Sequence, residues 1–257
     1  MDQVLSDLIL DIHRGATRIS VDNFQCWAFE QIQVVLPFDS GIWVNGHTKD
    51  KQFFTSEVST YNQREELYHL RNLYDEHSYL LGRMMREPGI PLNRNMLMPE
   101  SEFRELPIYK EYFSKYDMEY ALGTVKRLHN TDHYSYMGLY RSASSNIFSE
   151  RDRRTKQTLL LHLFDSYRYC RFYHFIDHKY LDDREVGKLV VDNEGVIRDL
   201  SDNVAVWFKR QWPEWSGPYL PAELKELGTE IVQEFKAFRA KINKSKDDLV
   251  GIELHPI

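Results

Sequence analysis

The segment Phe148-Ser-Glu-Arg-Asp-Arg-Arg-Thr-Lys-Gln-Thr-Leu-Leu-Leu-His-Leu163 decides the fold, because it begins the longest helix that the sequence predicts. Ser149 is placed to cap this helix, acidic residues fill its first turn, and Phe148 can pack back on it as a hydrophobic staple. Apolar residues then recur at spacings of three and four, so we expect a helix over 149–181. This helix separates two regions of different pattern.

The same spacing predicts a contact surface along the long helix. The residues that lie near a repeat of three and four are Leu160, Leu163, Tyr167 and Cys170. A stripe of this kind is typical of helices that pair, so we predict a homodimer through this seam. The alternative is that the stripe packs inside its own domain.

The region before the long helix alternates between helical and strand periods. Gly15 is expected to end a first amphipathic helix that begins at the N-terminus. The period further predicts a helix over 21–36, strands over 40–47 and 52–58, a helix over 63–85, a loop with short helical turns to 116, and strands over 120–128 and 134–140. This order favours a first domain over 1–181, built as an antiparallel sheet flanked by helices.

The region after the long helix restarts with strands. The pattern predicts strands over 188–191 and 196–200 around a tight turn, helices over 201–212 and 222–227, and strands over 236–242 and 249–255. We therefore predict a second, smaller α+β domain over 182–257. The fold class expected for the whole chain is α+β.

Composition limits the classes of function. The net charge of −6 and the pI of about 5.9 do not suit a stand-alone nucleic-acid binder. No uncharged apolar run approaches the roughly 18 residues of a membrane span, and the acidic N-terminus is unlike a signal peptide. Cys26 and Cys170 lie in apolar, helix-like stretches, which suits reduced, buried thiols. We expect a soluble cytoplasmic protein with no membrane partner.

The sequence carries no motif for catalysis. Neither a glycine-rich phosphate loop nor a nucleophile elbow is present. His174 and His178 lie four residues apart on a predicted helix, a spacing that can share a metal ion, but no HExxH surrounds them and no third ligand is indicated. We therefore expect that the protein binds no metal or cofactor and is not an enzyme. A metal-dependent enzyme that uses this histidine pair is the remaining catalytic alternative.

Aromatic residues on the predicted strands give the sharper hypothesis. Strict alternation places three tyrosines of one strand on a single face, and two further rings come from earlier strands. Aromatic rings on one side of a sheet can line an apolar pocket, in which the tyrosine hydroxyls offer hydrogen bonds to a ligand. The residues that we predict to bind an unidentified small molecule are Trp43, Phe53, Tyr134, Tyr136 and Tyr140. The alternative is a plain core between helices and sheet.

Several blocks resemble a known family. The blocks in the first region are Phe103-Arg-Glu-Leu-Pro-Ile-Tyr109, Leu139-Tyr-Arg-Ser142 and Phe148-Ser-Glu-Arg-Asp-Arg-Arg154. They resemble the GAF-like sensor region of LuxR-type helix-turn-helix regulators. The strand pair over 190–197 and the segment over 212–224 are similar to the short PAS-like domain that precedes the DNA-binding module in those proteins.

The resemblance implies the signal-sensing region of a bacterial transcription regulator. In that family a cue binds or perturbs the GAF-like domain, and the long helix would carry the change to the second domain and to the dimer. Nothing here matches the family's helix-turn-helix, so DNA would be a partner only through a module outside this chain. The alternative is a stand-alone interaction or dimerisation module without a small-molecule ligand.

Overall fold

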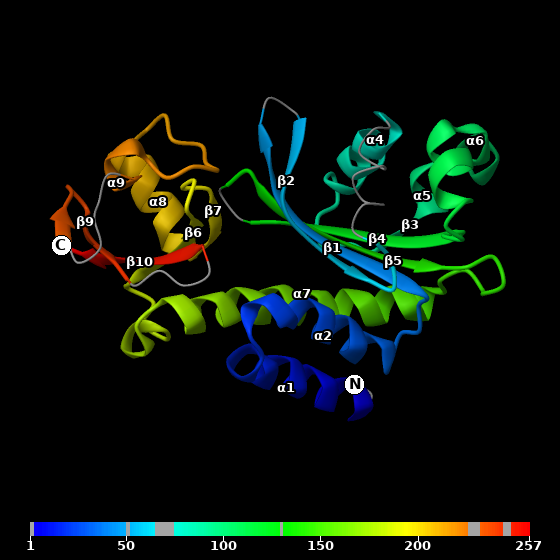
Figure 1. The fold of residues 1–257 in the computed structure, drawn as a ribbon, viewed down its shortest axis with the longest axis horizontal. Helices are drawn as coiled ribbons and strands as arrows, with labels where there is room; N and C mark the ends of the chain where they lie inside the picture. The colour runs from blue at the N-terminus through cyan, green and yellow to red at the C-terminus, as the bar shows by residue number, and fades with distance from the viewer. Residues whose placement is uncertain (1–2, 50–51, 65–74, 129–130, 226–231, 244–247) are drawn as a thin grey trace.

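The computed structural model describes residues 3–49, 52–64, 75–128, 131–225, 232–243 and 248–257. Its longest described helix, α7 (Glu150–Phe175), lies beneath two separate sheets (Figure 1). The predicted start is confirmed by a capping box. The Ser149 hydroxyl accepts a hydrogen bond from the Asp152 amide at 3.2 Å, and the Asp152 carboxylate accepts one from the Ser149 amide at 2.8 Å.

The long helix ends at Phe175, before the predicted Leu181. The amide of Asp177 donates to the buried carboxylate of Glu253 at 2.9 Å instead of continuing the helical hydrogen-bond ladder. The chain then turns into a short 3-10 helix, η2 (His178–Tyr180). A tertiary contact, which local periodicity does not encode, therefore sets this end.

The first sheet, called sheet A, has five antiparallel strands in the order β2-β1-β5-β4-β3. The strands are β1 (Ser40–Lys49), β2 (Gln52–Tyr61), β3 (Leu92–Asn93), β4 (Tyr120–Arg127) and β5 (His133–Arg141). The four longer strands agree with the sequence pattern. The two-residue strand β3 is too short for a period to reveal.

Helices cover both faces of sheet A (Figure 1). One face lies on α7 and α2 (Val21–Gln33), and α1 (Gln3–Arg18) packs beneath them. Over the other face lie α4 (Asp75–Met84), α5 (Arg94–Leu97), α6 (Glu100–Glu105) and the π-helical turn η1 (Tyr109–Phe113). Of the helix predicted over 63–85, residues 65–74 lie outside the described residues.

The second sheet, called sheet B, has the order β7-β6-β10-β9-β8 and is also antiparallel. The strands are β6 (Gly187–Asp192), β7 (Ile197–Leu200), β8 (Val232–Glu234), β9 (Phe238–Ile242) and β10 (Leu249–Pro256). Helices α8 (Asp202–Gln211) and α9 (Ala222–Lys225) lie over the face away from α7 (Figure 1). Numbered within its own sheet, each order reads 2-1-5-4-3, so both halves share one topology.

The α+β class is confirmed, with two antiparallel sheets flanked by helices. Residue 182 falls between the two sheets, and the division there stays a prediction. Alternating strand residues separate three cores. In sheet B, Val190 faces α7, whereas Leu189 and Val191 face α8. Helix α7 therefore contributes to the packing of both sheets.

The residues of the predicted dimer seam are buried within the chain itself. They are at most 3% exposed and pack against α1, α2 and sheet A: Leu160, Leu163, Tyr167 and Cys170. The expectation that a second copy covers this stripe is corrected, because the chain's own helices cover it. The homodimer itself stays a prediction.

Two further expectations are corrected. Cys26 is exposed on α2, and only Cys170 of the two thiols is buried. Gly15 does not end α1, which continues to Arg18. Within the described residues, no helix combines the length and apolar character needed to cross a membrane.

Gly15 is a packing residue, and this can be tested against a matched glycine. A Cβ at Gly15 would lie 2.2 Å from the Trp27 ring, whereas one at Gly82 of α4 would meet nothing within 4 Å. Gly15→Ala should destabilise the protein, because overpacking costs ~1–3 kcal/mol. Gly82→Ala should stabilise it by ~0.5–1 kcal/mol through helix propensity. Urea unfolding of both variants checks this, and a stable Gly15→Ala would show that Trp27 can move aside.

Candidate functional site

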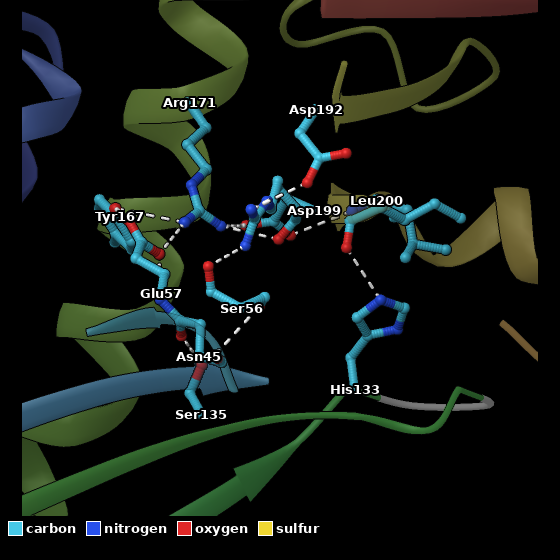
Figure 2. A network of polar contacts seen from close by, with 12 residues as sticks. Asn45, Ser56, Glu57, His133, Ser135, Tyr167, Arg171, Asp192, Asp199 and Leu200 are labelled. Carbon is cyan, nitrogen blue, oxygen red and sulfur yellow. Dashed lines mark hydrogen bonds and ion pairs between the residues drawn. The ribbon is translucent and has the colours of Figure 1, made fainter. Parts of the chain in front are cut away.

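Arg171 of α7 lies between the two sheets, with its side chain only 3% exposed (Figure 2). One guanidinium nitrogen, Nη2, donates to the Glu57 carboxylate on β2 and to the Tyr167 hydroxyl at 3.2 Å. The other, Nη1, donates to the Arg198 carbonyl at 2.7 Å and contacts Asp199 Oδ2 on β7 at 3.4 Å. A single buried cation therefore joins sheet A to sheet B.

The sheet A end of this network is fully bonded. Glu57 Oε1 accepts from the Tyr167 hydroxyl at 2.5 Å, and Glu57 Oε2 accepts from Asn45 Nδ2 at 2.6 Å. The Ser135 hydroxyl in turn donates to Asn45 Oδ1 at 2.5 Å. Burial would raise the pKa of Glu57, but the Arg171 charge and these hydrogen bonds hold that pKa below its ordinary value. Glu57 is therefore ionised at neutral pH.

The sheet B end is held more weakly. Burial raises the pKa of Asp199 above its ordinary value, against the opposing charges of Arg171 and Arg168. Its contact with Arg171 is also long for an ionic hydrogen bond, at 3.4 Å. The environment thus pushes the pKa values of the two carboxyl groups on Arg171 in opposite directions, and Asp199 gains a proton more readily than Glu57.

A second junction contact runs through a neutral histidine. His133 Nε2 of β5 lies 2.9 Å from the Ile197 carbonyl of β7, and it must donate because a carbonyl only accepts. Burial lowers the pKa of His133 to about 4, so its ring is uncharged at neutral pH. Beside it, Arg198 donates to the Ser56 carbonyl of β2 and pairs with Asp192 at 2.8 Å.

The network borders a small cavity of about 60 Å³ at the junction. A space of this size holds a few water molecules or one small polar group. Its walls come from both sheets and from α7, and the residues that supply polar groups include Asn45, Lys126, His133, Arg171, Arg198 and Asp199.

The strand pattern explains why polar groups gather here. Three pairs of opposed residues on β1 and β5 lie on the α7 side of sheet A. Along the strands the pairs change from apolar to polar to histidine: Trp43 with Met137, Asn45 with Ser135, and His47 with His133. The apolar pair packs on α7, Asn45 of the second pair bonds Glu57, and His133 of the third pair bonds the Ile197 carbonyl of sheet B.

Sheet A divides the predicted binding residues between its two faces. Trp43 packs on the α7 side, while the three tyrosines belong to the core on the opposite face. Phe53 meets the Tyr134 ring edge to face at 5.7 Å, and the Tyr136 and Tyr140 hydroxyl oxygens lie 3.4 Å apart. The structure thus brings four of the five together and places Trp43 apart from them. Tyr134 also lines the junction cavity. Ligand binding by this set stays a prediction.

The histidine pair of the catalytic alternative does not share one helix. His174 lies in α7, and its Nδ1 is 2.8 Å from the Cys170 carbonyl. His178 lies in η2, and its Nε2 is 3.0 Å from the Tyr173 carbonyl. Each ring therefore bonds the backbone separately. Among the described residues, no group of three or more His, Cys, Asp or Glu side chains could hold a metal ion.

Sequence reasoning missed Arg171, Glu57 and Asp199. A signal for Arg171 exists, because it continues the buried helical face at a spacing of four from Tyr167. Lys156 occupies the same kind of position, donating to the Leu122 and Met137 carbonyls of sheet A at 2.6 and 2.8 Å. A charged residue at an apolar-face position marks a buried polar contact.

Comparisons with known proteins concern the fold. No protein-family model matches the chain, and neither does any curated protein sequence. Similar solved structures include the N-acylhomoserine lactone dependent LuxR family transcription factor CepR2 from Burkholderia cenocepacia, at 12% identity and TM-score 0.45, over 63% of this chain and 93% of that one. The VqsR ligand-binding domain from Pseudomonas aeruginosa is similar at 13% identity and TM-score 0.48, over 65% of this chain and 96% of that one.

Residues 1–171 of SdiA from Escherichia coli are also similar, at 14% identity and TM-score 0.46, over 63% of this chain and 91% of that one. The similar solved structures thus include a LuxR family transcription factor and a ligand-binding domain. Identities and scores at this level do not show a family.

The neutral His133 predicts a pH dependence of stability. Its pKa is lowered from 6.5 to about 4 by folding, so its contribution is complete above pH 6.5 and is lost as the pH falls towards 4. The difference between the two pKa values corresponds to ~3 kcal/mol. Urea unfolding between pH 7 and 4 should show a shallower decline for His133→Gln than for the wild type. Equal slopes would mean that the ring titrates normally.

Proposed function

We propose that this chain is the signal-sensing region of a regulator, in which the first domain responds to a small molecule and α7 passes the change to the second domain. The observation that carries the proposal is the bridge made by Arg171. Its guanidinium bonds Glu57 in the first domain and Asp199 with the Arg198 carbonyl in the second.

A buried ionic bridge suits signal transfer because its partners are not independent. An unpaired guanidinium in a buried site costs several kcal/mol, so a shift of Glu57 must be compensated by the remaining partners of Arg171. Two of those partners, the Arg198 carbonyl and Asp199, lie on β7, where the raised pKa of Asp199 marks the weaker side of the bridge. A movement of β2 would therefore shift β7, because Glu57, Arg171 and Asp199 contact one another in series.

We propose a regulatory role in preference to a catalytic one. A general base needs a carboxylate oxygen or a ring nitrogen that is open to substrate. Both Glu57 oxygens accept hydrogen bonds, and Asp199 Oδ1 accepts from the Leu200 amide at 3.1 Å. The carboxylate oxygens of Glu57 and Asp199 are thus engaged by groups of the protein itself.

The shared strand order supports a further part of the proposal. Two sheets with the order 2-1-5-4-3 in one chain suit a pair of related sensor folds, a GAF-like first domain and a PAS-like second domain. Contact with DNA, and pairing with a second copy of the chain, would then follow from modules and surfaces outside the junction.

Communication across the junction can be tested by hydrogen exchange. Glu57→Gln keeps the shape of the side chain but removes its charge, so it should raise exchange at the β7 amides of 197–200 on the order of 10-fold. In an Arg171→Met background the same change should add little, because the bridge is already absent. Glu105→Gln is the control, since that exposed carboxylate pairs with Lys110 away from the junction. If the β7 amides exchange no faster in Glu57→Gln than in Glu105→Gln, the bridge does not transmit changes from β2 to β7.

Ligand retention separates the sensor from the alternative interaction module. Native mass spectrometry of protein purified without denaturation should show a bound small molecule, and Tyr136→Ala should lose it because Tyr136 lies in the aromatic core above sheet A. Tyr173→Ala is the control, since Tyr173 lies outside this core and stacks on His178. A wild type that carries no ligand, or a variant that retains it, would favour the interaction module.

A further inference from the structure

A second cluster of titratable groups joins α1 to α7, away from the junction. His13 Nε2 on α1 faces His162 Nδ1 on α7 at 3.1 Å, with the two rings edge to face and their centroids 5.2 Å apart. The Ser166 hydroxyl, whose residue is only 1% exposed, lies 3.0 Å from His13 Nδ1. Neither the proposed sensing role nor the packing of the cores uses this contact.

We propose that His13 and His162 are two ligands of a site for a divalent late transition-metal ion, namely Zn²⁺, Ni²⁺ or Cu²⁺, that fastens α1 to α7. Imidazole nitrogens bind these ions at about 2.0–2.1 Å. Two such bonds place the nitrogens about 3.4 Å apart in a tetrahedral site and about 2.9 Å apart at neighbouring corners of a square plane. The observed separation of 3.1 Å lies between these values.

The Ser166 hydroxyl supplies the outer contact that metal-binding histidines use. A ligating imidazole donates its other N–H to an oxygen, which fixes the tautomer and the ring orientation. When His13 Nδ1 donates to Ser166 Oγ, its Nε2 presents a lone pair towards His162. Without metal, the two facing nitrogens share one proton. When the ion binds, His162 takes the tautomer that carries this proton on Nε2, and the two facing nitrogens form the metal–nitrogen bonds.

The surroundings leave this position open to a cation. His13 is exposed, so an ion and its water ligands have access from solvent. The neighbouring arginines are already paired, Arg14 with Asp11 at 3.2 Å and Arg168 with Asp202 at 3.3 Å. Because the described residues contain no group of three metal-binding side chains, water completes the coordination sphere. This predicts moderate affinity and an exchangeable ion.

The test is calorimetric titration of Zn²⁺ and Ni²⁺ into chelator-treated, tag-free full chain. We expect one ion per chain, with affinity lowered at least 10-fold by His13→Ala and by His162→Ala. Ser166→Ala should weaken binding by about 10-fold, the usual effect of losing an outer contact. His178→Ala is the control, since that exposed histidine stacks on Tyr173 in another part of the chain.

A second readout keeps the test independent of folding defects. Zn²⁺ should raise the melting temperature of the wild type and of His178→Ala, and leave that of His13→Ala unchanged. Binding that survives His13→Ala, or that falls equally in His178→Ala, would overturn the site. Neither outcome bears on the Arg171 bridge, because the two clusters share no residue.

Discussion

The buried Arg171 guanidinium between the two sheets constrains the positions of the strands and the helix that surround it. A buried cation needs anionic and carbonyl partners within hydrogen-bond distance, and Arg171 draws them from β2 and from β7. Helix α7 must therefore lie beneath both sheets, and the register of β2 must bring Glu57 to the α7 side. The partners of this side chain, together with the His133 contact to Ile197 and the Arg198 contact to Ser56, hold the two sheets in place relative to each other.

Three polar anchors hold helix α7, two on the helix and one just past its end. Lys156 bonds strand carbonyls of sheet A, Arg171 spans the junction, and the Asp177 amide just past the helix end bonds Glu253 in sheet B. Burial lowers the pKa of Lys156 well below its ordinary value, so its two carbonyl contacts are made at a cost in desolvation. These anchors connect the helix to strands of both sheets.

The two halves share a topology but differ in what covers it. Sheet A is enclosed on both faces by helices, and its face away from α7 holds the tyrosine core that Phe53 joins. Sheet B is covered by α8 and α9 on one face and by the end of α7 on the other. The first half therefore has the larger aromatic interior, and the second half receives the contacts of the junction.

Local interactions made most elements readable from the sequence. The capping box at Ser149 involves neighbours three residues apart, and the strand alternation around Tyr136 reflects a period of two, so both are written in adjacent residues. The tertiary structure decided which neighbour covers each face. It buried the seam at Leu160 within the chain and turned Gly15 into a contact for Trp27. It also brought Glu57 and Asp199, far apart in sequence, to one guanidinium, because burial and charge pairing depend on distances in space that local periodicity does not contain.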